Sequence, residues 1–389
     1  MQNKKAKLNI LYTTLRYPPA PGGAEELEKQ LAEGMIQLGH NVQVFTSDLK
    51  KHWPMVKFNS DEIKNDPKCI KRFYSLALPR LPYPLMPLME VAVLKEKNLD
   101  IIHAHNFYHY PADMSKFYAL VKRVPFVFSS YFYIDSRTAL KWRIYRRTLG
   151  AFTMQADCLI AITDFEKNLI LKEYPKIKRI EVINPGIDHS EFENYNVADF
   201  LLKYNLPQDK FKILFAGRIC TGKGVDLLIQ SAPEIIKQFP DLIFLMAGSD
   251  FTNELDDLKK MARKLGVEKY FYWLGNLSRS DLISAYFTSD LFVLPSRYEA
   301  FGIVLAEAMR AGLPIVATNY SAIPEVVKNK ETGLLFELNN FKDLTEKICI
   351  LINNDALREK MSCAGREESK KYDWGKMVVQ VEEIYKSLA

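Results

Sequence analysis

The sequence predicts an α/β protein made of two doubly wound, Rossmann-like domains, each built on a parallel sheet. Three observations lead to this prediction. The chain has 389 residues, more than the roughly 100–200 expected of one domain. Short apolar runs alternate with longer helical patterns along the chain, which is typical of βαβ units. A turn-rich segment, residues 184–188, separates two series of such runs, and we interpret it as the linker.

In the first half, six apolar runs are predicted strands: residues 8–12, 42–46, 101–104, 126–129, 159–163 and 180–183. Residues 25–38 have helical spacing and end at Gly39, a frequent helix stop. Four prolines within residues 78–88 argue against a helix there, because proline lacks the N–H group and clashes with the preceding turn. We expect an ordered apolar connector in that segment, with contact to an acceptor or a lipid as the alternative.

The second half repeats the rhythm and closes with a helix. Its predicted strands are residues 212–216, 243–247, 270–274, 291–294, 315–318 and 334–337. Apolar residues in the last helix, residues 376–388, are spaced to form one buried stripe: Met377, Val378, Val381, Ile384 and Leu388. Ligands of doubly wound sheets lie at the carboxyl ends of the strands, so we expect a cleft between two such domains to hold the site.

Composition excludes several classes of protein. A net charge of +6 is too mild for a dedicated nucleic-acid binder. Five cysteines, odd in number and never in CxxC spacing, argue against a disulfide scaffold or a zinc knuckle. No run approaches the 18 apolar residues of a membrane span, and the basic start leads into a short apolar run that is typical of a first strand. We expect a soluble, cytoplasmic protein.

The positive charge is concentrated in the first half. Residues 1–190 hold 28 Lys and Arg against 19 Asp and Glu (+9), and residues 191–389 hold 25 against 28 (−3). Within the first half, five cations interleave with apolar residues: Arg137, Lys141, Arg143, Arg146 and Arg147. This pattern indicates a basic, amphipathic surface helix that contacts a membrane or an anionic acceptor. A helix face that is merely solvated is the alternative.

Two glycine-containing loops follow predicted strands. Gly22 and Gly23 precede a helix whose N-terminus favours a bulky anion, although tight strand–helix turns also use glycine for geometry alone. The second loop, residues 217–224, carries Arg218 and Lys223. Arginine binds a diphosphate bidentately and lysine acts as a point charge, so this loop is suited to a diphosphate. Two surface cations on an ordinary loop are the alternative.

A third element places two carboxylates eight positions apart across a strand–loop–helix junction. Glu299 lies in the predicted loop and Glu307 within the following helix, and Gly302 leaves the backbone N–H groups at the helix start open to a ligand. One carboxylate can bind hydroxyls at one end of an extended ligand while the other binds a second ring. Glu307 on a solvated helix face is the alternative.

At these residues the chain resembles the retaining glycosyltransferases of family 4, which have the GT-B fold. The resemblance covers nearly the whole chain, and the E-x7-E element is its most specific part. The matching segments are Gly22-Gly23-Ala24-Glu25, His103-Ala104-His105-Asn106, Gly217-Arg218, Lys223-Gly224, Leu274-Gly275, Glu299 to Glu307, residues 308–317 and Gly333-Leu334-Leu335.

The resemblance implies a role for each matching residue. Glu307 would bind the ribose of a nucleotide sugar, and Arg218 and Lys223 its diphosphate. The sugar and phosphates would contact Glu299, Phe301, Gly302 and Ile303, the last three partly through backbone N–H groups. Leu274 would frame the base, and Gly22 and Gly23 would face the phosphate from the other domain. Cations and dipoles would then stabilise the leaving group in place of a metal or cofactor, and the chain has no Asp-x-Asp.

One departure from the family pattern concerns the first domain. Many members have a histidine after the strand at residues 126–129, where this chain has Tyr131 or Tyr133. Two histidines follow the preceding strand. We therefore regard His105 as a candidate catalytic residue, and His109 and Tyr131 as candidate contacts to the acceptor or the sugar. We expect His103 to lie in the core.

The leading interpretation is a nucleotide-sugar-dependent transferase acting on a glycan, lipid-linked or cell-surface acceptor, at the inner face of the membrane. Its domains would be an acceptor-side domain (residues 1–188), a donor-binding domain (residues 189–371) and a last helix (residues 372–389) that crosses back to the first domain. A catalytically impaired, nucleotide-sugar-binding partner subunit is one alternative. A nicotinamide-dependent oxidoreductase is another, although no GxGxxG follows a predicted strand.

Overall fold

The computed structural model describes residues 7–52, 55–78, 81–133 and 140–389. The chain divides into two compact units. Unit 1 comprises Met1–Pro185 and Trp374–Ala389, and unit 2 comprises Gly186–Asp373. The division between Pro185 and Gly186 lies inside the turn-rich segment, residues 184–188, that we interpret as the linker. The last helix belongs to unit 1 although it follows unit 2 in the sequence.

Unit 1 is built on a seven-stranded parallel sheet in the order β11-β10-β9-β8-β1-β2-β5. Its strands are β1 (Asn9–Thr13), β2 (Asn41–Ser47), β5 (Ile70–Phe73), β8 (Ile101–His105), β9 (Phe126–Ser129), β10 (Cys158–Ala161) and β11 (Ile180–Val182). Two antiparallel hairpins accompany the sheet: β3 (Leu49–His52) with β4 (Met55–Lys57), and β6 (Leu76–Leu78) with β7 (Leu81–Leu85). The strand order reverses between β1 and β8, which makes this pair the topological switch point.

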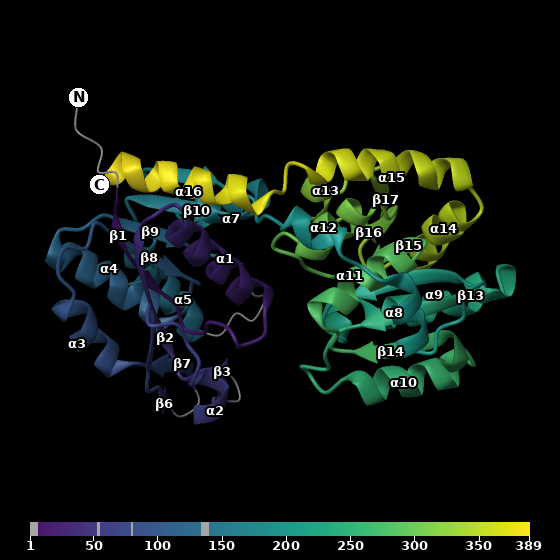
Figure 1. Ribbon diagram of the computed structural model, residues 1–389, viewed down its shortest axis with the longest axis horizontal. Helices are drawn as coiled ribbons and strands as arrows, with labels where there is room; N and C mark the ends of the chain where they lie inside the picture. The colour runs from purple at the N-terminus through teal and green to yellow at the C-terminus, as the bar shows by residue number, and fades with distance from the viewer. Residues whose placement is uncertain (1–6, 53–54, 79–80, 134–139) are drawn as a thin grey trace. The chain divides into compact units, whose positions relative to one another are not determined.

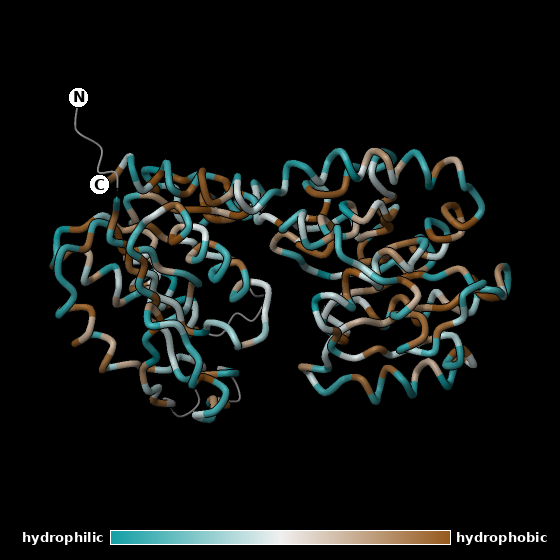
Figure 2. Tube along the Cα trace, in the orientation of Figure 1, coloured by the Kyte–Doolittle hydropathy of each residue, from teal (hydrophilic) through white to brown (hydrophobic). Residues whose placement is uncertain are grey.

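Helices cover both faces of this sheet (Figure 1). They are α1 (Gly23–Gln37), α2 (Ser60–Ile63), α3 (Pro87–Lys95), α4 (Tyr110–Lys122), α5 (Leu140–Arg147), α6 (Leu149–Thr153), α7 (Asp164–Glu173) and α16 (Trp374–Leu388). One core lies between the sheet and α1 with α16, and it contains Met377, Val378, Val381 and Ile384. The other lies beneath α3, α4 and α7. Figure 2 shows polar and apolar residues alternating along α16, as a half-buried helix requires.

Unit 2 is built on a six-stranded parallel sheet in the order β14-β13-β12-β15-β16-β17. Its strands are β12 (Phe211–Ala216), β13 (Leu242–Ala247), β14 (Phe271–Gly275), β15 (Leu291–Leu294), β16 (Ile315–Thr318) and β17 (Gly333–Phe336). Its α-helices are α8 (Val197–Lys203), α9 (Val225–Gln238), α10 (Leu255–Lys264), α11 (Arg279–Thr288), α12 (Ile303–Ala311), α13 (Ile323–Val326), α14 (Phe341–Ile352) and α15 (Asp355–Ser369). Three short 3-10 turns are η1 (His189–Glu193), η2 (Thr221–Lys223) and η3 (Glu268–Tyr270). The switch point lies between β12 and β15.

The predicted fold class, two doubly wound α/β domains, is confirmed. Each of the twelve predicted strands exists within two residues of its expected ends. The connector expected in residues 78–88 is wrong in its details: the segment contains strand β7, and Pro87 begins helix α3. Proline is tolerated at the first helical position because that N–H has no partner inside the helix. In the described part of the chain, no helix is both long and apolar enough to cross a membrane.

Candidate functional site

The switch point of unit 2 is where the second glycine loop lies. Strand β12 ends at Ala216, the chain turns through η2, and α9 begins after Gly224. Gly224 has φ +73°, and a Cβ there would lie 1.9 Å from the carbonyl oxygen of Pro295. Only glycine permits this close approach, which presses the loop after β12 against the loop after β15.

A direct ion pair joins those two loops. The Lys223 Nζ lies 2.6 Å from Glu299 Oε1, and the two side chains are only 16% and 11% exposed. The Glu299 backbone N–H donates to Ser321 Oγ at 3.0 Å. The structure therefore brings together two residues that are 76 positions apart in the sequence, and it holds a cation and a carboxylate at the carboxyl edge of the sheet.

Arg297 fixes the same two loops and was not found from the sequence. Its backbone N–H donates to the carbonyl of Gly222 at 3.1 Å. Its guanidinium donates to both carboxylate oxygens of Asp226, at 2.7 and 2.8 Å. Such bidentate pairs add geometric specificity to an ion pair. Arg297 is thus a positioning residue for the Lys223–Glu299 pair.

Helix α12 begins beside Glu299. Gly302, the residue before it, has φ +86°, a left-handed conformation that favours glycine. The Phe301 side chain is 3% exposed and packs edge-to-face against Tyr372, with ring centroids 5.2 Å apart. Of Phe301, only the backbone is therefore available to a ligand, whereas Ile303 begins the helix half-buried.

Glu307 lies inside the protein, so the alternative of a solvated helix face is wrong. It is 5% exposed. Its Oε2 accepts from the Tyr286 hydroxyl at 2.8 Å, and its Oε1 is paired with Arg279. Arg279 also pairs with Glu191, at 2.8 Å. Burial and then the Glu307 charge raise the pKa of Tyr286, which keeps that hydroxyl a donor.

Arg279 and Tyr286 were missed by sequence reasoning, because they belong to α11 and no motif connects them to α12. Burial lowers the pKa of Arg279, but the carboxylates of Glu307 and Glu191 outweigh burial and raise it overall. Two other residues predicted to contact the nucleotide sugar do not belong to this hydrogen-bond network. Arg218 is exposed after β12, and Leu274 is half-buried near the end of the edge strand β14.

At the switch point of unit 1, β8 carries two imidazoles whose centroids are 4.2 Å apart and whose planes are tilted by 32°. His103 lies in the core, as expected. Its Nδ1 lies 2.5 Å from the Tyr385 hydroxyl, and its Nε2 lies 2.9 Å from Ser129 Oγ. His105 is 1% exposed, and its Nε2 has no hydrogen-bond partner. Burial lowers the pKa of His105 to about 3, so its imidazole is neutral at physiological pH.

Tyr131, at the position where many family members have histidine, stacks on His105. The ring planes are 23° apart, and the hydroxyl lies 3.5 Å from His105 Nδ1. Tyr131 has φ +45°, unusual for a residue with a bulky side chain. The buried carboxylate of Glu166 holds this loop, accepting from Ser130 Oγ at 2.7 Å and from the Phe132 N–H at 2.5 Å. Glu166 was also missed from the sequence.

The first glycine loop is crowded by acidic residues. A Cβ on Gly22 would lie 2.0 Å from Glu25 Oε2, whereas Gly23 has no atom within 4 Å of such a Cβ. Glu25 pairs with Arg16. Glu28 is 2% exposed and accepts from Asn106 Nδ2 at 2.7 Å, and burial and Glu25 raise its pKa. Gly23 is therefore the open position for an anion in this loop.

The remaining predicted residues lie on α4 and α5. His109 precedes α4 and is half-buried. Lys141, Arg143 and Arg147 are exposed on α5. Arg146 points inward, with Nε 3.3 Å from Glu173 Oε1, so it does not belong to the basic face. Arg137 lies outside the described residues.

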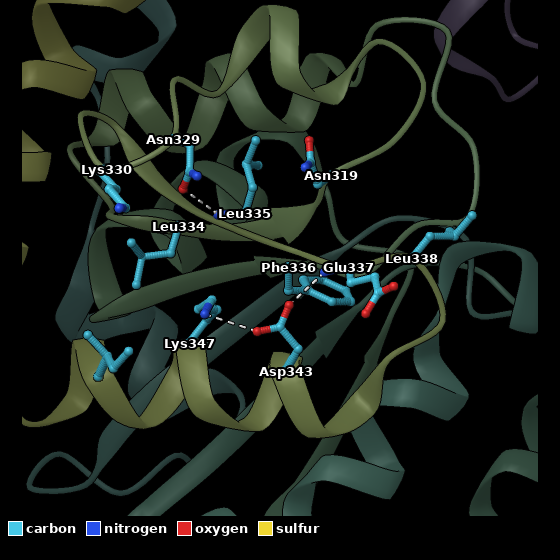
Figure 3. A pocket seen from close by; sticks show the side chains of 11 residues that line it. Asn319, Asn329, Lys330, Leu334, Leu335, Phe336, Glu337, Leu338, Asp343 and Lys347 are labelled. Atoms are coloured by element: carbon cyan, nitrogen blue, oxygen red, sulfur yellow. Dashed lines mark hydrogen bonds and ion pairs between the residues drawn. The ribbon is translucent and has the colours of Figure 1, made fainter.

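A pocket with a volume of about 470 Å³ lies elsewhere, between β17 and α14. Figure 3 shows its rim, where Asp343 pairs with Lys347 at 3.0 Å and Asn329 accepts from the Leu335 N–H at 3.1 Å. None of the candidate residues lines it. Among the described residues, no three His, Cys, Asp or Glu side chains form a group that could hold a metal ion.

Comparisons with known proteins identify the family. The family model described as "Glycosyltransferase Family 4" matches residues 21–191, and "Glycosyl transferases group 1" matches residues 199–368. An uncharacterised glycosyltransferase of Methanocaldococcus jannaschii is 31% identical over 76% of this chain and 78% of its own. The phosphatidyl-myo-inositol mannosyltransferase of Mycobacterium tuberculosis is 25% identical over 95% of this chain and 94% of its own.

Other matches are partial or structural. A D-inositol 3-phosphate glycosyltransferase of Nocardioides is 27% identical over 59% of this chain, and the match spans only 54% of that relative's length. The structure of Anabaena HepE in complex with UDP and glucose superposes with a TM-score of 0.79 at 18% identity. It covers 98% of this chain and all of HepE, which shows a shared fold. The matched segments and the E-x7-E element agree: the chain belongs to the family 4 glycosyltransferases, the glycosyl transferases group 1.

Proposed function

We propose that this protein transfers a sugar from a nucleotide-sugar donor to an acceptor hydroxyl, with retention of configuration and without a metal. The observation that carries the proposal is the Lys223–Glu299 pair, 2.6 Å apart beside the start of α12. A partly buried cation next to backbone N–H groups at a helix N-terminus suits a diphosphate. A carboxylate in the same place suits the hydroxyls of the transferred sugar.

The donor extends from this pair in both directions. Glu307 accepts hydrogen bonds from the ribose hydroxyls, and Leu274 frames the base. Arg218, exposed after β12, joins Lys223 on the diphosphate. The N–H groups of Gly302 and Ile303 complete the phosphate contacts. HepE was solved with UDP and glucose, so a uridine donor is the first to test.

In the reaction, the bond between the anomeric carbon and the diphosphate oxygen breaks as the acceptor oxygen forms its own bond on the same face. The acceptor proton passes to the leaving phosphate oxygen. Lys223, Arg218 and the helix N-terminus stabilise the negative charge that develops there. In metal-dependent transferases a bound metal ion stabilises this charge. We propose a metal-independent reaction because these two cations and the helix N-terminus would supply that stabilisation here.

Unit 1 supplies the acceptor side. His105 is neutral and has one nitrogen without a protein partner, so it acts as a hydrogen-bonding group rather than as a charged acid. Tyr131 contacts the acceptor or the sugar through its hydroxyl, His109 contacts the acceptor, and Gly23 with Gly22 contacts the phosphate. The name of the mycobacterial relative includes a phosphatidyl lipid, which supports a lipid-linked acceptor. Lys141, Arg143 and Arg147 then face an anionic membrane.

One observation favours a second candidate function. Tyr131 stands where many family members have histidine, and a tyrosine does not reproduce an imidazole. The protein would then be a nucleotide-sugar-binding partner subunit without its own turnover. The Lys223–Glu299 pair and the Glu307 network count against this candidate, because loss of catalysis more often erodes such residues too.

Thermal-shift measurements with UDP-, GDP- and ADP-sugars, with and without EDTA, test the donor proposal. A ligand at 100 times its Kd stabilises a protein by about 2.7 kcal/mol. We expect one donor to raise the Tm of the wild type with EDTA present, and Lys223→Ala and Glu307→Gln to lose that shift. Lys264→Ala, an exposed cation on α10, serves as the matched control. A shift that survives both variants would place the donor elsewhere.

Turnover separates the two candidate functions. With the identified donor, slow hydrolysis or transfer to a simple lipid phosphate is expected, and NMR of the product's anomeric proton reports whether configuration is retained. Donor binding without any hydrolysis or transfer, in wild type and in Tyr131→His alike, would favour the partner-subunit function.

A further inference from the structure

Helix α5 covers a small pocket in unit 1 that none of the assigned roles uses. The pocket has a volume of about 150 Å³ and is lined by Tyr83, Lys141, Trp142, Tyr145 and Leu149. Tyr83 comes from the hairpin β6–β7, and the other residues come from α5 and the first turn of α6. Three aromatic rings and a leucine therefore form most of its wall.

The two tyrosine hydroxyls of the wall bind a buried carboxylate outside the pocket. The Tyr83 hydroxyl donates to Asp113 at 2.5 Å, and the Tyr145 hydroxyl donates to the same carboxylate at 2.9 Å. Asp113 is 1% exposed on α4. Because both hydroxyls are bound there, the pocket receives the carbon faces of the two rings. The buried carboxylate also keeps the rings in place, so the pocket is preformed.

The outward face of α5 is both apolar and basic. Leu140 and Ile144 are 69% and 54% exposed, one helical turn apart. Arg143 and Arg147 are exposed on the same side. Lys141 extends over Trp142, its Nζ 5.3 Å from the ring centroid. Exposed apolar residues flanked by cations, with a tryptophan nearby, are typical of helices that lie in a membrane interface.

We propose that this pocket binds the end of one hydrocarbon chain of an anionic lipid whose phosphate headgroup contacts Lys141, while Arg143 and Arg147 on the outward face of α5 contact neighbouring anionic headgroups. The chain's chemistry matches the apolar wall, and the headgroup's charge matches the helix. This inference deepens the membrane contact proposed above and rests on it. The membrane contact and the chain-binding pocket can be refuted independently. The charge variants below test the membrane contact, and the variant that fills the pocket tests the binding of the hydrocarbon chain.

The pocket's size sets a limit on the chain it holds. An apolar cavity of about 150 Å³ accommodates a benzene-sized group, so a few methylenes fill it. Each buried methylene contributes about 0.8 kcal/mol, which is about a fourfold gain in affinity. Affinity should therefore rise with chain length and then level off, unlike partition into a bilayer, which continues to strengthen.

The first experiment titrates the full chain with inorganic phosphate and with butyl, hexyl and octyl phosphate, following the fluorescence of Trp142. Trp142→Phe identifies that signal among the other tryptophans. We expect affinity to increase by about fourfold for each buried methylene. Leu149→Phe, which fills the pocket from a position already 39% exposed and adds no tryptophan, should abolish the chain-length dependence. Affinity that is the same for inorganic and octyl phosphate would overturn the proposal.

The second experiment uses vesicles of phosphatidylcholine, with and without phosphatidylglycerol, whose acyl chains are brominated to quench tryptophan. Arg143→Ser with Arg147→Ser should weaken binding to the anionic vesicles by about fivefold for each cation removed. Lys264→Ser with Lys360→Ser, exposed cations of unit 2, is the matched control. Trp142 emission should be quenched in the wild type and not in Leu149→Phe, which fills the pocket without adding a tryptophan. Quenching of Trp142 that persists in Leu149→Phe would show a contact without a chain site and overturn the inference.

Discussion

Replacing Tyr286 with Phe is the sharpest test of the network that holds Glu307. The substitution removes one oxygen from a fully buried ring and leaves its shape unchanged. That oxygen donates to Glu307 Oε2 at 2.8 Å. A hydrogen bond to a charged group contributes about 1.5–3 kcal/mol, and the carboxylate is left with only Arg279. We therefore expect the variant to lose about that much stability.

The loss should be visible in two measurements. For a unit of this size, 1 kcal/mol shifts the Tm by about 2–4 °C, so a decrease of about 3–12 °C is expected. If Glu307 binds the ribose, a carboxylate that has lost a fixed partner must be reordered on binding, and the Kd for the nucleotide should rise by up to about tenfold. Calorimetric titration with UDP and a melting curve measure the two effects.

Tyr195→Phe provides the matched control, because its ring is 46% exposed and stacks on Phe287. It should leave both the Tm and the Kd unchanged. A Tyr286→Phe variant with wild-type stability would refute the energetic reasoning. One with reduced stability and unchanged nucleotide affinity would show that the network serves the fold and that Glu307 does not contact the ribose.

Three further predictions concern unit 1. Glu166→Gln should lower the unfolding free energy by about 3 kcal/mol, measured by urea denaturation, because an amide nitrogen cannot accept the bonds that the carboxylate accepts. Burial lowers the pKa of His105 to about 3, so the unfolded state takes up the extra proton as pH falls below about 6.5. This one proton should lower the unfolding free energy by about 1.4 kcal/mol for each pH unit below that value. His105→Gln should remove this contribution from the pH dependence of the unfolding free energy, measured by the same urea denaturation. Tyr385→Phe, which removes the hydroxyl between His103 and Tyr12, should lower the Tm; an unchanged Tm would refute the buried link between α16 and the sheet.

The sequence predicted the strands well because parallel sheets are buried on both faces and their strands are continuous apolar runs. It failed for β5 and for the hairpins β3–β4 and β6–β7, whose strands are short and, except for β6, contain charged residues or proline. Residues 70–73 contain Lys71 and Arg72, and β5 pairs only with β2 at the edge of the sheet. Periodicity over four residues cannot separate such a strand from a loop.

The site was predictable only where a motif is local. Glu299, Gly302 and Glu307 lie within nine residues, and Arg218 and Lys223 lie within one loop. Their supports are distant: Tyr286 precedes Glu307 by 21 positions, and Arg297 follows Asp226 by 71. Nothing in the spacing of these residues indicates the contact. Only the folded sheet, which places β12 beside β15, brings the two loops together.

A shared arrangement underlies both units. In each, the first strand of the sheet lies next to the strand where the order reverses. Polar side chains lie at the carboxyl ends of these strands or, for Tyr131, after the neighbouring strand β9. In unit 2 the loops are joined by a cation and a carboxylate, Lys223 and Glu299, and the proposed donor would place its diphosphate there. In unit 1 the corresponding place holds the neutral His105 stacked on Tyr131. A neutral, buried pair of this kind favours a hydroxyl over an anion, because it offers hydrogen bonds without a compensating charge. Under the function proposed above, this difference assigns the charged donor to unit 2 and the acceptor hydroxyl to unit 1.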